Sequence, residues 1–95
     1  MAETKESPGK ADYLEKKEQE KQQRKMMRLI AASEQTIADL EQQIKDVEQA
    51  LASPLEEGQD DMQTLFERHH SLKQIHKDEM TLWAERVENL ENIPQ

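Results

Sequence analysis

The sequence predicts an all-α protein, a two-helix antiparallel coiled-coil hairpin that follows a disordered N-terminal linker. Of its 95 residues 36% are charged and only three are aromatic, a composition typical of long helices rather than of a layered core. Apolar residues recur at alternating spacings of three and four. Proline and glycine occur near the ends and at one point between two periodic segments. High charge with low hydrophobicity would also suit a disordered chain, but a sustained period favours the coiled coil.

Residues 1–11, "MAETKESPGKA", mix serine, proline, glycine and charge, and we interpret them as a flexible linker. A linker at this end suggests that the chain was part of something larger. The following "DYLE" has the form of a capping box, in which Asp12 accepts a backbone N–H and Glu15 reaches back. The first helix is therefore predicted over residues 12–52.

The first helix has the clearest period. From position 12 no proline or glycine occurs before Pro54. The heptad positions predicted to form its apolar seam are Met26, Ile30, Ser33, Ile37, Leu40, Ile44, Val47 and Leu51. About 40 residues at about 1.5 Å each make a helix of about 60 Å.

Residues 53–60 are predicted to form the loop, since Pro54 ends the helix and Gly58 permits a turn. Asp60 with Gln63 is a second possible capping box, so a second helix is predicted over 61–92, with a tail at 93–95. Its stripe is broader and less regular, with apolar residues Met62, Leu65, Phe66, Leu72, Ile75, Met80, Trp83, Val87 and Leu90.

A short connection predicts antiparallel helices. Folding about residue 56 or 57 makes position i face about 113 minus i. The facing pairs are then Leu51–Met62, Val47–Phe66, Ile44–His69, Ile37–His76, Ser33–Met80 and Ile30–Trp83. A shift of this register by one heptad stays open. The first helix would extend beyond the second by roughly nine residues, about 13 Å.

Positive charge is concentrated at that overhanging end. The net charge is +4 over residues 16–28 and −10 over residues 29–95. The candidate nucleic-acid-binding residues are Lys16, Lys17, Lys21, Arg24, Lys25 and Arg28. Helical cations can bind a phosphate backbone, but no aromatic residues interleave them to stack bases. The alternative is a solvated helix face with internal pairs to Glu18 and Glu20.

Other chemistry has little support. Without cysteine, disulfides and thiolate sites are excluded. His69 and His76 lie two turns apart, about 10.5 Å, too far to share a zinc ion, so we expect them in the seam or at its edge, where they would make the hairpin pH-sensitive. Trp83 is expected to anchor the core. No catalytic site, metal or cofactor is predicted in this segment, and no apolar run could serve as a signal peptide or span a membrane.

Several segments together resemble one family. "DYLEKKEQEKQQRKMMRLI", "IADLEQQIKDVEQALASP", "LFERHHSLK" and "MTLWAERVENLE" are similar to the C-terminal coiled-coil domain of ABC-F ATPases, the Uup-like soluble relatives of ABC transporters. The resemblance covers residues 12–91. Tyr13 matches the opening aromatic residue of the family, and Trp83 the late tryptophan. The family often continues that tryptophan as "WEEL", whereas this chain has "WAER", with Ala84 and Arg86.

The resemblance implies a cytoplasmic, non-catalytic arm of an ATPase whose cassettes bind ATP and magnesium elsewhere. Such an arm contacts ribosomal RNA, transfer RNA or duplex DNA and is linked to translation, with no membrane and no small-molecule substrate as partner. A monomer is expected. The alternative function is a coiled-coil adaptor or dimerisation module, which would use Phe66, Ile75 and Val87 to pair two hairpins.

Overall fold

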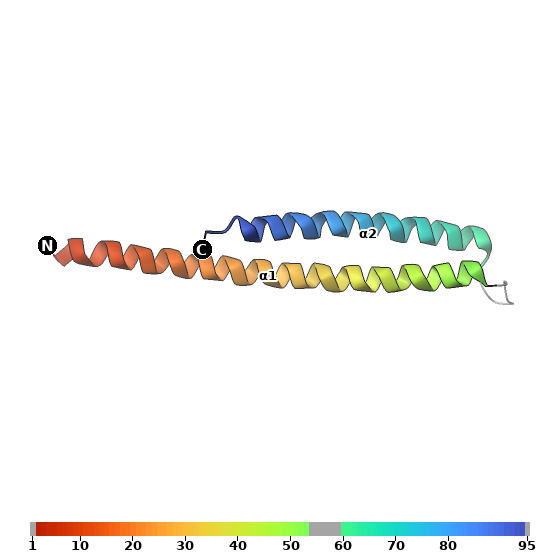
Figure 1. Cartoon of the computed structure of the whole chain (residues 1–95), viewed down its shortest axis with the longest axis horizontal. Helices are drawn as coiled ribbons and strands as arrows, with labels where there is room; N and C mark the ends of the chain where they lie inside the picture. Colours follow the sequence, from red (N-terminus) through yellow and green to blue (C-terminus); the bar gives the residue numbers. More distant parts are fainter. Residues whose placement is uncertain (1, 54–59, 95) are drawn as a thin grey trace.

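The computed structural model describes residues 2–53 and 60–94, with side chains from residue 9 onward in those ranges. Two helices, α1 (Ala2–Ala52) and α2 (Met62–Glu91), lie side by side and antiparallel (Figure 1). The molecule is a rod of 83 × 17 × 14 Å. The prediction of an all-α helical hairpin is confirmed. Among the described residues, neither helix is long and apolar enough to cross a membrane.

Helix α1 begins ten residues earlier than the capping-box pattern predicts. It includes residues 2–11, so Asp12 lies inside the helix and does not cap it. Extending an existing helix adds one backbone hydrogen bond for each residue that is fixed, so it is far easier than starting one. The role of residues 1–11 as a linker stays a prediction.

A small apolar core lies between the helices near the loop. Its buried members are Leu40, Ile44, Val47, Leu65 and Leu72, with Ala50 and Leu51 packed against them. The predicted α1 seam is confirmed, since all of its heptad positions from Met26 to Leu51 are buried or half-buried.

The α2 side of the seam differs from the prediction at several residues, since Met62, Phe66, Ile75 and Met80 of the predicted apolar stripe are all exposed. Leu65 is 3% exposed, whereas Phe66 is 58% exposed. Leu65 begins an unbroken series of buried and half-buried positions with the spacings 4, 3, 4, 3, 4, 3, 4, namely 65, 69, 72, 76, 79, 83, 86 and 90. Phe66 lies outside this series, so its apolar side chain is not covered by α1.

The predicted register is wrong by about one helical turn. Cross-helix hydrogen bonds join Glu48 to His69, Glu41 to His76 and Glu34 to Trp83, so facing positions sum to 117 rather than 113. None of these three α2 residues therefore faces the α1 residue expected for it, and Ser33 contacts Arg86 rather than Met80.

Helix α2 is capped by Asp61 and not by Asp60. The Asp61 side chain accepts the backbone N–H of Thr64 at 2.8 Å. Asp60 instead pairs with Arg68 at 2.7 Å. At the other end the backbone N–H of Asn92 bonds to the carbonyl of Glu88. Of the predicted loop 53–60, residues 54–59 lie outside the described residues.

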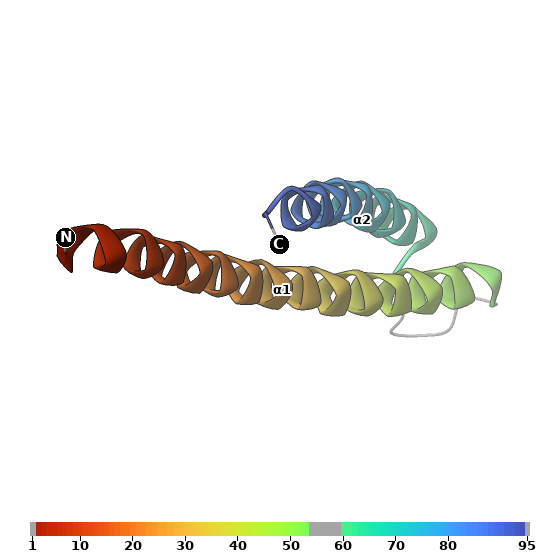
Figure 2. The ribbon, with the colours of Figure 1, turned by 60° about the vertical axis from the view of Figure 1, so that its left-hand side comes forward.

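The N-terminal part of α1 extends past the end of α2. Pro94 lies beside Gln19 and Gln23, so α1 is uncovered from about residue 18 to its start. That segment measures about 25 Å at about 1.5 Å per residue. Figures 1 and 2 show from two directions that α2 covers the C-terminal part of α1 and leaves its N-terminal part bare.

Candidate nucleic-acid interface

The six predicted basic residues are all exposed on α1. Four of them, Lys17, Lys21, Arg24 and Arg28, follow the spacings 4, 3 and 4 along one face. The seam positions 19, 23, 26 and 30 have the same spacings, offset by two residues. Two residues correspond to about 200° around an α-helix, so these four cations, the basic stripe, point away from α2.

The other two candidates lie off this stripe. Lys16 lines a shallow hollow with Gln19, Gln23 and Pro94 at the end of the C-terminal tail. Lys25 lines a second hollow, with Asn89 and Ile93 of the same tail region. The structure therefore divides the predicted set into four outward cations and two that border the chain's own C-terminal end.

No ion pair between described residues involves the basic stripe. The ion pairs formed between described residues within 4 Å join Arg68 to Asp60 and two histidines to glutamates. The internal pairs to Glu18 and Glu20 that the alternative interpretation expects are not among them. Lys17 instead lies over the Tyr13 ring, 5.5 Å from its centroid, a cation–π contact that leaves its charge in place.

The outer face of α1 continues without acidic residues. Positions continuing the stripe toward the loop are Ala31, Gln35, Ala38, Gln42, Lys45 and Gln49, all exposed. The acids of α1 lie instead on the flanks of this face. Sequence reasoning missed this separation of charge, although the two-residue offset between stripe and seam could have revealed it.

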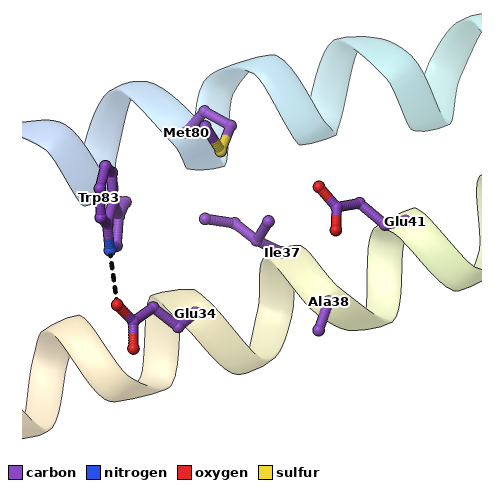
Figure 3. A pocket seen from close by; sticks show the side chains of 6 residues that line it. All are labelled: Glu34, Ile37, Ala38, Glu41, Met80 and Trp83. Atoms are coloured by element: carbon purple, nitrogen blue, oxygen red, sulfur yellow. Dashed lines mark hydrogen bonds between the residues drawn. The ribbon is translucent and has the colours of Figure 1, made fainter.

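One edge of the seam carries three polar contacts at seven-residue intervals. Glu48 bonds to Nε2 of His69 at 3.0 Å, and Glu41 bonds to Nε2 of His76 at 3.1 Å. Nε1–H of Trp83 donates to Glu34 at 3.1 Å (Figure 3). The histidines therefore lie at the edge of the seam, as expected. Trp83 is half-buried there and is not a fully buried anchor.

Arg86 of α2 has a structural role in the seam. Its Nη1 donates to Oγ of Ser33 at 2.6 Å and to the backbone carbonyl of Leu29 at 2.9 Å. Ser33 is 1% exposed, and its small side chain leaves room for the guanidinium. Hydrophobic periodicity could not find this contact, because both partners are polar.

A groove between the helices lies beside the Trp83 contact. It has a volume of about 280 Å³ and is lined by Glu34, Ile37, Ala38, Glu41, Met80 and Trp83. Figure 3 shows the two carboxylates on either side of the apolar residues. In the part of the chain that the structure describes, no three His, Cys, Asp or Glu side chains gather closely enough to hold a metal ion.

No protein-family model, no curated protein and no solved structure matches this chain. The chemistry of the site therefore rests on its own geometry. Four exposed cations on one helical face provide electrostatic attraction for a polyanion, and they provide no means of reading bases.

Proposed function

We propose that this chain is a nucleic-acid- or ribosome-binding arm in which the basic stripe of α1 contacts a phosphate backbone. The supporting observation is that Lys17, Lys21, Arg24 and Arg28 are all exposed on the face of α1 opposite α2, and that Lys17 lies on the segment that α2 leaves uncovered. The seam gives the arm rigidity. The resemblance to ABC-F ATPases suggests that the arm belongs to a cytoplasmic ATPase acting in translation, whose cassettes bind ATP and magnesium, and that the arm itself is not catalytic.

The expected affinity follows from the charge distribution. Four cations that neutralise about four phosphates give a slope of log K against log salt of about −3.6 for duplex DNA and about −2.8 for single strands. The net charge of −10 on residues 29–95 repels other phosphates and limits affinity. We therefore expect weak binding that is tolerant of sequence and strongly dependent on salt.

The test is a salt titration of binding to ribosomes, transfer RNA and duplex DNA. Reversing all four stripe charges to glutamate should abolish binding to the true partner. The two-site variant Lys21→Glu/Arg28→Glu should roughly halve the salt slope. Its matched control is Lys73→Glu/Lys77→Glu, which makes the same charge change at two exposed positions of α2. Equal losses in the two variants, or unchanged binding after the four-site reversal, would reject the stripe as the contact.

The adaptor function has one observation in its favour, since Phe66 and Ile75 are 58% and 51% exposed. They are nine residues apart, about 900° of helical rotation, and so lie on opposite flanks of α2. A single partner helix would not cover both. Alanine substitution at Phe66 followed by sedimentation tests this function, because an adaptor would lose its association and the arm would not.

A further inference from the structure

Helix α1 carries a second heptad stripe beside the seam, and α2 contacts it only at its edge, through Glu34, Glu41 and Glu48 and through the groove at Ala38. Its positions repeat at spacings of 4 and 3, like those of the seam, and all are exposed. We name this stripe the α1 flank; its residues are Tyr13, Lys17, Glu20, Arg24, Met27, Ala31, Glu34, Ala38, Glu41, Lys45 and Glu48. A heptad stripe on a helical surface is the pattern by which one helix packs along another.

Charge on the α1 flank is arranged in two complementary halves. The N-terminal half has cations at Lys17 and Arg24, with Glu20 between them. The C-terminal half has acids at Glu41 and Glu48, with Lys45 between them. From position 17 to 24 the charges are positive, negative and positive, at spacings of 3 and 4. Read backwards from position 48 to 41 they are negative, positive and negative at the same spacings. One copy of the flank therefore matches a second copy that runs in the opposite direction.

This match defines a register. If position i faces position 65 minus i of a second copy, Lys17 meets Glu48, Glu20 meets Lys45 and Arg24 meets Glu41. All three are opposite charges. Met27 then meets Ala38, and the twofold axis passes between positions 32 and 33, so each contact occurs twice in an isologous pair.

The groove of Figure 3 is placed to receive Met27 of the second copy. Its apolar lining is Ile37, Ala38, Met80 and Trp83, with Glu34 and Glu41 at either end. Met27 is 58% exposed, and methionine fills irregular apolar spaces well. In this register Met27 of the second copy enters the groove while Arg24 of that copy reaches Glu41.

Other alignments fit less well. With facing positions that sum to 58, Arg24 meets Glu34 and Lys17 meets Glu41, but Glu20 would enter the groove between two carboxylates. A parallel pair in register would place Lys17 against Lys17 and Glu41 against Glu41. The acids of the flank keep their contacts with α2 in every case, because a carboxylate can accept from several donors.

We propose that a second copy of this chain docks antiparallel on the α1 flank in the register that sums to 65. This inference does not depend on the proposed function, although the two share Lys17 and Arg24. Lys21 and Arg28 belong to the basic stripe and not to the flank. Nucleic acid and a second copy would therefore compete for two of the four stripe cations.

The experiment is a charge exchange followed by sedimentation equilibrium up to about 1 mM protein. Lys17→Glu/Arg24→Glu alone should weaken the dimer by at least tenfold, and so should Glu41→Lys/Glu48→Lys alone. Mixing the two variants should restore association, since each altered residue then faces an opposite charge. Lys21→Glu/Arg28→Glu, with the same charge change off the flank, should leave the dimer intact while weakening nucleic-acid binding.

A cross-link tests the register independently. The chain has no cysteine, so introduced thiols are the only ones present. Met27→Cys/Ala38→Cys should oxidise to a covalent dimer, because positions 27 and 38 of one chain lie about 16 Å apart on the same helix and cannot pair internally. A monomer at all concentrations, a dimer unaffected by the charge variants, or dimer cross-linking that is no faster than that of Met27→Cys alone would overturn the proposal.

Discussion

The two halves of the hairpin are held together by different chemistry. Near the loop the contacts are apolar, and the five hydrophobic residues that are buried in the described part of the chain all lie there, between positions 40 and 47 of α1 and 65 and 72 of α2. Toward the open end the buried residue is Ser33, which bonds to Arg86, and Trp83 bonds to Glu34 at the edge. Apolar burial supplies most of the stabilisation, whereas directional bonds restrict how the partners can be placed. The loop half should therefore carry the stability and the open half the alignment.

The largest effect should come from the apolar half. Leu65→Ala should cost about 2–5 kcal/mol, because Leu65 is 3% exposed and its removal leaves a cavity in a small core. The matched control is Phe66→Ala, where the removed side chain is 58% exposed and the cost should stay within about 0.5 kcal/mol. Urea unfolding followed by circular dichroism measures both. Similar costs for the two neighbours would mean that Phe66, and not Leu65, lies in the seam.

In the polar half, Arg86→Met should cost about 1–3 kcal/mol, since it leaves the buried Ser33 hydroxyl without its cross-helix donor. Adding Ser33→Ala should recover part of this loss, because removing both polar partners is less costly than removing one. A double-mutant cycle measured by chemical denaturation isolates the coupling. Strictly additive effects would show that the two side chains do not stabilise each other.

A smaller effect is expected at the edge of the seam. Trp83→Phe removes the donor to Glu34 and should cost about 0.5–1.5 kcal/mol. Glu34→Gln, which keeps an acceptor at that position, should cost less. Thermal unfolding of the two variants gives the comparison. A cost for Trp83→Phe as large as that of Leu65→Ala would mean that the open half is as tightly packed as the loop half.

The smallest effect should be the pH response of the α2 cap. The hydrogen bond from the backbone N–H of Thr64 lowers the pKa of Asp61 below 3.8. Because the folded pKa is lower than the unfolded one, the cap's contribution is fully present above about pH 4 and is lost as the pH falls through the lowered pKa. Asp61→Asn keeps a capping oxygen that does not titrate.

Melting temperatures of the parent chain and of Asp61→Asn, measured from about pH 5 to about pH 2, test this response, since the other carboxylates titrate in both proteins. The parent should lose stability relative to the variant in the acid range. Parallel curves would contradict the cap.

The sequence predicts the two helices and the α1 seam well, because residues spaced alternately by four and three lie along a single face of an α-helix. The α2 seam is harder to predict, since Leu65 and Phe66 are adjacent apolar residues and choosing between them rotates α2 by about 100°. Arg86 could not be found from apolar spacing, since it is a cation that enters the seam at a serine. The six candidate cations are exposed, and the two-residue offset of Arg24 and Arg28 from the predicted seam positions Met26 and Ile30 was enough to indicate that they point away from α2.

The pairing of Ser33 with Arg86 also bears on slippage between the helices. The contacts of Glu34, Glu41 and Glu48 repeat every seven residues, so sliding α2 by one heptad would exchange equivalent partners, with His76 meeting Glu48 and Trp83 meeting Glu41. Arg86 has no equivalent place to go, because one heptad in either direction brings its guanidinium to Leu40 or Met26. A desolvated charge facing an apolar side chain is costly. The Ser33–Arg86 pair thus distinguishes the native register from registers shifted by one heptad, in which the other edge contacts would be nearly equivalent.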